Sequence, residues 1–271
     1  MCTISCLVAF LGFIGRIGLL ETLLTTLSFN IGWNLSYYLN FNLQYARSEN
    51  KILFDDFGTD NIYLFGSFFA LFMMIMLSCK PALLAENKAY VMNRISGLLS
   101  LMGTAFVFAT FALTGHVYPV RLNSLANNLS SMNTIYAMST SVVCSYIFSA
   151  LFNKGNVGIR EAMLGTITGG VLVGSVAAFP YNLTIALTVG AIAGLISAFW
   201  LSFIHPRINN SSVFDSHGIL GSFWLASIFG GVVFAPSLIQ QYVNYGIGEN
   251  LYGTTLFGDT EYNFVTNSAG F

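Results

Sequence analysis

The segment from Phe214 to Gly231 carries residue types and a spacing that could support proton chemistry. It reads FDSHGILGSFWLASIFGG, so Asp215, Ser216 and His217 stand directly before a long apolar run. An ionisable side chain within or beside hydrocarbon is costly, and such a residue is by default a candidate for function. His217 is therefore a candidate for proton exchange. The alternative is a histidine that caps the start of a helix at the membrane surface.

The other reactive residue types form no recognisable site. The four cysteines lack CxxC spacing, so they predict small packing residues and no metal site; they are Cys2, Cys6, Cys79 and Cys144. The three histidines fall in separate segments, and the chain has no HExxH, GxSxG or Walker spacing. We therefore predict no enzyme, no metal and no cofactor. His205 precedes Pro206 and is expected at a helix end, where a cation suits the helix dipole.

Composition predicts the class of protein. Of the 271 residues 55% are hydrophobic and only 8% are charged, and the mean hydropathy is +0.70. Soluble domains carry roughly a quarter charged residues, so the chain is predicted to be a polytopic membrane protein. Backbone groups in lipid must bond within their own segment, which favours an all-α fold. The net charge of -1 excludes a basic surface for nucleic acid.

Apolar stretches of about 20 residues, the length that crosses hydrocarbon, predict the spans. Seven are expected, near residues 19–41, 61–79, 92–114, 131–152, 160–179, 182–204 and 217–240. Residues 3–15 are too short and are expected to be the end of a span or a re-entrant piece. Residues 1–240 are thus predicted to form one transmembrane domain, and 241–271 a polar C-terminal tail.

Cations are unequally divided between the two ends of these spans. One face is predicted to carry seven, namely Arg16, Lys80, Lys88, Arg94, Lys154, Arg160 and Arg207. The other is predicted to carry three, Arg47, Lys51 and Arg121, together with most of the acids, including Asp55. Because positive residues stay inside, the seven-cation face is expected in the cytoplasm or matrix.

Glycines at four-residue spacing predict close helix contacts. The pairs are Gly165 with Gly169, Gly170 with Gly174, and Gly190 with Gly194. Small residues at this spacing let helix backbones approach, which drives association in lipid. A close approach of this kind can also narrow a pore.

Five segments in order resemble the Rh branch of the ammonium transporter and Rhesus glycoprotein family. SHGILG (Ser216–Gly221) is similar to L-H-G-[IM]-P-G, and TITGGVLVG (Thr166–Gly174) to L-A-G-G-V-A-V-G. NTIYAMSTSVV (Asn133–Val143) resembles a helix start of the family, and RIGLLETLLTTL the opening of its fifth helix. DDFGTDNIYLFGSFFAL (Asp55–Leu71) is similar to D-A-G-G-S-M-T-I-H-T-F-G-A-Y-F-G-L.

The resemblance implies a trimer whose subunits each have a narrow pore between inverted repeats of five helices. Two histidines at mid-membrane would share a proton there. His217 matches the second of them, while Tyr63 stands where the first is expected. A phenol, with a pKa near 10, does not exchange protons near neutrality as imidazole does. Asp55 matches the acid at the outer mouth, and FALT replaces W-P-S-F near Phe111–Thr114.

The resemblance begins at the family's fourth to fifth helix and lacks its last long helix, so most of one repeat is expected to be missing. We therefore favour a non-conducting structural or accessory subunit of a larger membrane complex, contacting lipid and either other subunits or further copies of itself. The alternative is an ammonia/ammonium channel completed by another subunit, with His217, Tyr63 and Asp55 lining the pore. The expected location is the plasma membrane by family analogy, or the mitochondrial inner membrane within a large complex.

Overall fold

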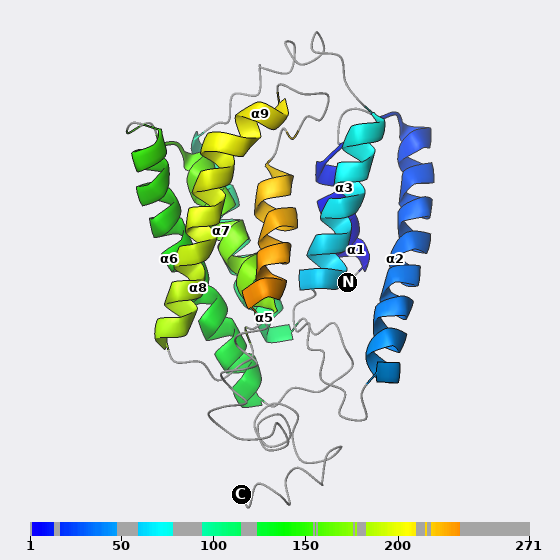
Figure 1. Ribbon diagram of the computed structural model, residues 1–271, viewed down its shortest axis with the longest axis horizontal. Coiled ribbons are helices and arrows are strands. Elements are labelled where there is room, and N and C mark those ends of the chain that lie inside the picture. The colour runs from blue at the N-terminus through cyan, green and yellow to red at the C-terminus, as the bar shows by residue number, and fades with distance from the viewer. Residues whose placement is uncertain are drawn as a thin grey trace, which may run out of the picture.

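The computed structural model describes most of the apolar part of the chain, and each element within that part is helical (Figure 1). The described residues are 2–13, 17–47, 59–77, 94–114, 124–153, 155, 157–175, 177, 183–209, 215 and 218–233. The predictions for Asp55, His217 and the tail at 241–271 lie outside these residues.

Successive helices run in opposite directions, except for α8 and α9, which belong to one rod (Figure 1). They are α1 (Cys2–Leu11), α2 (Leu19–Arg47), α3 (Phe65–Met76), α5 (Arg94–Thr114), α6 (Ser124–Phe152), α7 (Ile159–Gly174), α8 (Leu183–Phe199) and α9 (His205–Asn209). The described residues also contain the π-helical segments η1 (Thr59–Leu64), η3 (Trp200–Ile204) and η4 (Leu220–Leu225). η1 continues into α3, η3 links α8 to α9, and η4 opens the helical stretch Leu220–Val233.

Each predicted span falls on one of these helices. Two helical stretches within the described part, Ser130–Phe152 and Leu183–Ile208, are long and apolar enough by themselves to cross a membrane, with mean hydropathies of 1.6 and 2.0. The short N-terminal stretch forms the ten-residue α1, which begins about halfway up the bundle (Figure 1). α2 and α6 are longer than predicted, at 29 residues each, because polar residues extend them beyond their apolar parts.

Two helices begin with the same local device. In α2 the Gly18 N–H donates to Glu21 Oε2 at 2.9 Å, and in α7 the Gly158 N–H donates to Glu161 Oε2 at 2.7 Å. A glutamate in the first turn thereby satisfies an N–H that precedes the helix and opposes the positive end of the helix dipole.

His205 does not end a helix, so the prediction for it was wrong. The helical run continues from α8 through η3 and past Pro206 to Asn209. In the π turn the His205 N–H bonds to Trp200 O, five residues back. Because this turn already departs from the α-helical ladder, the missing N–H of Pro206 falls where that ladder is interrupted.

A tightly packed core is formed by α6, α7 and α8, which we call the glycine-packed core. A Cβ built on Gly165 would lie 2.7 Å from Ser145 Cβ, and one on Gly169 would lie 2.7 Å from Ser141 Cβ. A Cβ on Gly190 would overlap Ala137, and one on Gly194 would overlap the Ser141 carbonyl. Both α7 and α8 therefore touch α6 at backbone distance.

Two further glycines of α7 contribute differently. A Cβ on Gly170 would meet the ring of Phe108 on α5, so this glycine admits a neighbouring side chain. Gly174 is buried at the end of α7. Hydroxyl groups bridge the same helices: Ser141 Oγ donates to Gly165 O at 2.6 Å, and Ser145 Oγ donates to Glu161 O at 3.0 Å.

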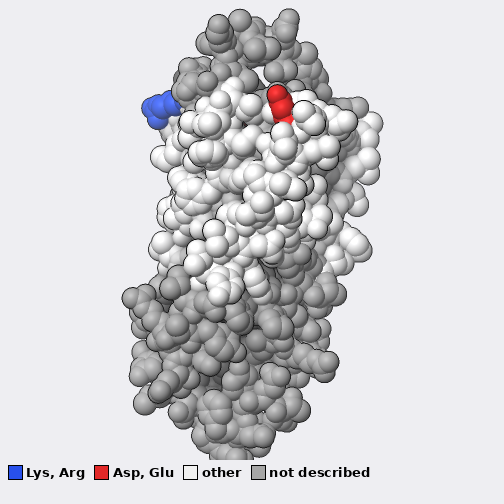
Figure 2. All heavy atoms as spheres, turned by 90° about the vertical axis from the view of Figure 1, so that its right-hand side faces the viewer, with Lys and Arg blue, Asp and Glu red and all other residues white. Residues whose placement is uncertain are grey.

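α2 packs on α3 through aromatic rings, a contact that we call the ring-packed edge. Phe29, 1% exposed, lies with its ring centroid 5.4 Å from Phe65 and 5.0 Å from Phe69. α2 is the outermost helix on its side of the bundle (Figure 1). Seen from that side, the described surface carries almost no charge between its ends (Figure 2). Such a neutral band is what a lipid-facing surface requires.

Candidate functional site

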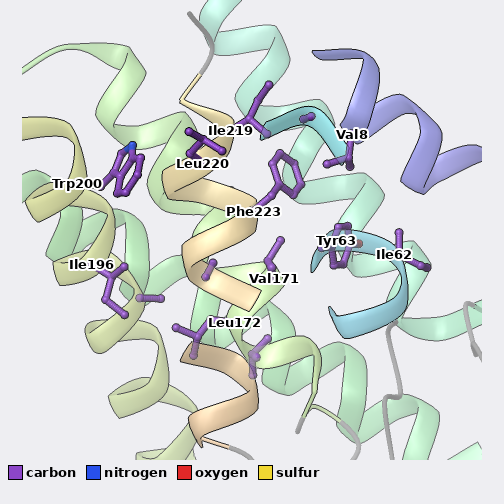
Figure 3. Close-up of a cluster of buried hydrophobic side chains, with 14 of the residues drawn as sticks. Val8, Ile62, Tyr63, Val171, Leu172, Ile196, Trp200, Ile219, Leu220 and Phe223 are labelled. Carbon is purple, nitrogen blue, oxygen red and sulfur yellow. The ribbon is translucent and has the colours of Figure 1, made fainter. Parts of the chain in front are cut away.

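Three aromatic rings from three elements meet inside the bundle. Tyr63 of η1 is 5% exposed; its ring centroid lies 6.0 Å from that of Phe108 on α5 and 5.7 Å from that of Phe223 on η4. Figure 3 shows Tyr63 and Phe223 within one apolar cluster, with Val8 and Ile62 beside them. We call Tyr63, Phe108 and Phe223 the ring stack. Offset rings at such distances attract one another beyond the area they bury.

Hydrogen bonds to the neighbouring helices hold η1 in place. Ser5 Oγ of α1 donates to Ile62 O at 2.8 Å, and Thr59 Oγ1 donates to Val171 O of α7 at 3.2 Å. Ser67 Oγ donates to Tyr63 O at 2.6 Å. A π turn leaves carbonyl groups outside the regular ladder, and hydroxyl donors can satisfy them. The position of Tyr63 is therefore fixed by α1, α7 and its own helix.

A polar cluster lies where α7, α9 and the last described helix meet. Asp215 is fully buried, and its Oδ1 and Oδ2 accept the N–H groups of Ile219 at 2.9 Å and Leu220 at 3.1 Å. This carboxylate caps the helix start that follows the His217 position. Gly218 has φ +74 and a Cβ there would lie 2.8 Å from Leu164 Cδ1, so the turn requires glycine.

His205 joins this cluster from α9. Its Nε2 lies 2.8 Å from Arg160 Nη2 and 2.8 Å from the carbonyl oxygen of Asp215. A guanidinium only donates hydrogen bonds. The His205 nitrogen therefore accepts from Arg160 when it carries a lone pair, and donates to Asp215 when it carries a proton.

Opposing effects act on the pKa of Asp215. Burial raises the pKa of the Asp215 carboxyl above its ordinary value of 3.8, while the N–H groups of Ile219 and Leu220 and the charge of Arg160 lower it. The net direction is upward because removal from water is the largest of these effects.

Of the predicted pore residues, Tyr63 is described, and it is packed among apolar rings and not beside the Asp215 turn. Sequence reasoning missed Phe108 and Phe223 of the ring stack and Arg160 of the polar cluster; it singled out Asp215 beside His217 but did not predict that Asp215 caps the helix start. One signal for the polar cluster was available, because Arg160 and Asp215 are charged residues next to predicted spans in a chain with 8% charge.

Comparison with known proteins decides the family. The model of the Ammonium Transporter Family matches residues 2–266, which is nearly the whole chain. The chain belongs to this family. Ammonium transporter Rh type C of Xenopus laevis is 25% identical over 237 residues, covering 86% of this chain and 47% of that protein. Ammonium transporter Rh type A of Mus musculus is 27% identical over 178 residues, covering 63% of this chain and 39% of that protein.

A solved structure shares the fold. Rh50 of Nitrosomonas europaea, described together with conduction by the Rhesus protein family of channels, superposes with a TM-score of 0.71 at 23% identity. The match covers 88% of this chain and 60% of that one. The all-α, polytopic Rh-like bundle predicted from sequence is thereby confirmed. The chain spans about half the length of the curated relatives it matches.

Proposed function

We propose that this chain is a non-conducting structural or accessory subunit of a larger membrane assembly. One observation carries the proposal. Tyr63, at the position that the family resemblance assigns to the first pore histidine, is buried in the ring stack between Phe108 and Phe223. The packed rings at this position support the proposal, because a proton-exchanging path of the kind that the resemblance implies would need an imidazole there.

The surroundings of Tyr63 support the same conclusion. Hydrogen bonds to α1 and α7 hold η1, and the apolar cluster contains Tyr63 and Phe223, with Phe108 packed against it. A buried core is close-packed, so moving one ring aside displaces several neighbours. An opening for ammonia along this line would therefore require rearrangement of η1 against η4.

A second function is favoured by a different observation. SHGILG retains His217 within the segment that resembles the family signature, and the curated relatives are named ammonium transporters. The alternative is thus an ammonia/ammonium channel whose pore is completed by another subunit. In that channel His217 would be the proton-exchanging residue, and Tyr63 and Asp55 would line the path.

Ammonia flux into liposomes distinguishes the two functions. The full chain is purified, reconstituted, and mixed rapidly with an ammonium gradient while the internal pH is followed. We expect the rate to equal that of protein-free liposomes, because the ring stack occupies the Tyr63 position. The variant Tyr63→Phe, which keeps the ring, should behave identically. A rate above background that His217→Ala removes would establish the channel and overturn the proposal.

The assembly role needs its own measurement. Isolation of the protein from its native membrane in mild detergent, followed by mass determination, should give a complex larger than a single chain. A homogeneous monomer would contradict the role. Fractionation of the same cells would decide between the plasma membrane and the mitochondrial inner membrane, the two locations predicted from sequence.

A further inference from the structure

We propose that a buried water molecule joins α6 to η3, at the end of the glycine-packed core where α7 begins. Its partners in the protein are the hydroxyl groups of Ser149 on α6 and Ser202 on η3, which we call the hydroxyl pair. This inference goes beyond the proposed function, because a bound water in this place requires neither conduction nor a partner subunit.

Both oxygen atoms of the hydroxyl pair are buried. Ser149 is 0% exposed, and the Oγ of Ser202 is shielded although its residue is only half-buried. Neither oxygen has a hydrogen-bond partner in the part of the chain that the structure describes. Buried polar atoms in proteins are nearly always bonded, either to the protein or to an ordered water. Two such oxygens therefore indicate a shared ligand if they lie at the same level.

The contact between α6 and α7 explains why Ser149 finds no carbonyl group. Ser141 and Ser145 of α6 donate to the carbonyls of Gly165 and Glu161 of α7, respectively. Each step of four residues along α6 thus moves four residues back along α7. One further step would pair Ser149 with the residue four before Glu161, which lies outside α7. The ladder of hydroxyl–carbonyl bonds therefore stops at Ser149.

The contact between α6 and α8 brings the hydroxyl pair to one level. These two helices run in the same direction (Figure 1). A Cβ on Gly190 would overlap Ala137, and one on Gly194 would overlap the Ser141 carbonyl. Each of these contacts joins residues 53 positions apart, and the members of the hydroxyl pair are separated by the same number.

A ring contact shows that α6 and the helix after α8 stay together in η3. Phe152 of α6 and Phe203 of η3 lie with their ring centroids 5.2 Å apart. Ser202 is next to Phe203 in the chain, and Ser149 lies one helical turn before Phe152. The two hydroxyl groups are thus carried by neighbouring helices at one depth. A single small ligand at this depth can contact both.

The surrounding chemistry favours an uncharged ligand. Glu161 Oε2 accepts the Gly158 N–H at 2.7 Å, so a carboxylate lies at the start of α7 and would repel an anion. The described residues contain no cluster of three metal-ligating side chains. A hydroxyl group both donates and accepts hydrogen bonds. Water does the same and needs two to four polar partners, of which the hydroxyl pair supplies two.

Alanine substitution in the full chain tests the water through its effect on stability. Ser149→Ala and Ser202→Ala should each raise the equilibrium constant of unfolding in detergent about 3-fold, the effect of an average hydrogen bond between membrane helices. Because both bonds go to the same water, the double variant should lie close to either single variant. Without a bound water, each alanine would remove a buried hydroxyl that makes no bond, and stability would stay the same or rise. That outcome would overturn the proposal.

Ser145 provides the matched control on the same face of α6. Its hydroxyl already donates to Glu161 O at 3.0 Å and shares no partner with Ser202. The effects of Ser145→Ala and Ser202→Ala should therefore add when the two are combined. Equal coupling in the control pair and in the hydroxyl pair would mean that α6 is loosened as a whole, and the assignment of a shared water would fail.

An electron cryo-microscopy map of the full chain in lipid nanodiscs, detailed enough to resolve ordered waters, identifies the ligand. We expect density about 2.8 Å from both Ser149 Oγ and Ser202 Oγ, and none there in Ser149→Ala. A direct bond between the two hydroxyls, or a lipid oxygen in the same place, would contradict the proposal. These readouts are independent of ammonia flux, so failure of the water site and failure of the proposed function are distinguishable.

Discussion

The glycine-packed core and the ring-packed edge both hold neighbouring helices together, but the core does so with small residues and the edge with large ones. In the core, the contact residues have little or no side chain, so the backbone of α8 lies directly against that of α6, as at Gly190 and Ala137. At the edge, α2 is held away from α3 by the large side chains of Phe29, Phe65 and Phe69. Lipid offers helices little hydrophobic drive to associate, so both contacts depend on packing. The core should therefore be sensitive to added volume, and the edge to lost volume.

Adding volume to the core should have the largest effect. A Cβ at Gly194 would lie 2.8 Å from Cys144 Cβ and from Ser145 N, with no flexible atom to give way. We expect Gly194→Leu to lower the free energy of unfolding by more than about 3 kcal/mol, the upper range for overpacking. Thermal unfolding in detergent measures this. Gly103→Leu on α5, where nothing lies within 4 Å, is the matched control and should be tolerated.

Removing volume from the edge should come next. Phe29→Ala leaves a gap between Phe65 and Phe69, and we expect a loss of about 3 kcal/mol, the lower end for a buried phenylalanine. The lower end applies because lipid reduces the hydrophobic part of that loss. Leu23→Ala, a truncation on the same helix at a 62% exposed position, should change little. Similar losses for both variants would mean that α2 is not anchored by its rings.

The polar cluster between α7, α9 and the last described helix can be tested by pH. Asp215→Ala should cost about 1–2 kcal/mol, because two N–H groups lose their cap. Burial raises the pKa of Asp215, so the folded state binds the proton more tightly than the unfolded state. Stability should then fall as the pH rises from the ordinary aspartate pKa toward the raised one. Asp215→Asn should lack this slope in unfolding curves taken across that range.

Removing a hydroxyl from the core should have the smallest effect. Ser141 Oγ donates to Gly165 O at 2.6 Å, and hydrogen bonds between membrane helices average about 0.6 kcal/mol. Ser141→Ala keeps the small volume that the contact needs, so a loss of about that size is expected from equilibrium unfolding in detergent. A loss above about 2 kcal/mol would show that the hydroxyl, and not its small size, holds α6 to α7.

The order of the helices that the structure describes could be predicted because each span needs its own apolar stretch, and length alone locates it. The glycine pairs could be named for the same reason, since four-residue spacing is local. The partners of those glycines could not: Gly165 meets Ser145 of the preceding helix, and Gly190 meets Ala137. Nor could the course of the helix through Pro206, because a π turn is selected by tertiary packing.

The sequence predicted some of the residues of the candidate site, but not which residues they contact. Tyr63 stood out because a phenol replaces an expected imidazole. That Phe108 and Phe223 close around it follows from the meeting of η1, α5 and η4, which no local pattern encodes. Arg160 and His205 are 45 positions apart, and His205 and Asp215 are 10 apart. Their juxtaposition depends on where three helices end at one face.

The π-helical segments affect the direction in which the buried aromatic side chains point. η1, η3 and η4 hold Tyr63, Trp200 and Phe223, one buried aromatic residue each. A π turn houses one surplus residue in an otherwise α-helical rod. Deleting a single residue from η4 would restore α-helical hydrogen bonds there. The residues that follow would then rotate by about 100° about the helix axis. The direction in which Phe223 points is thus set by chain length as well as by side-chain identity.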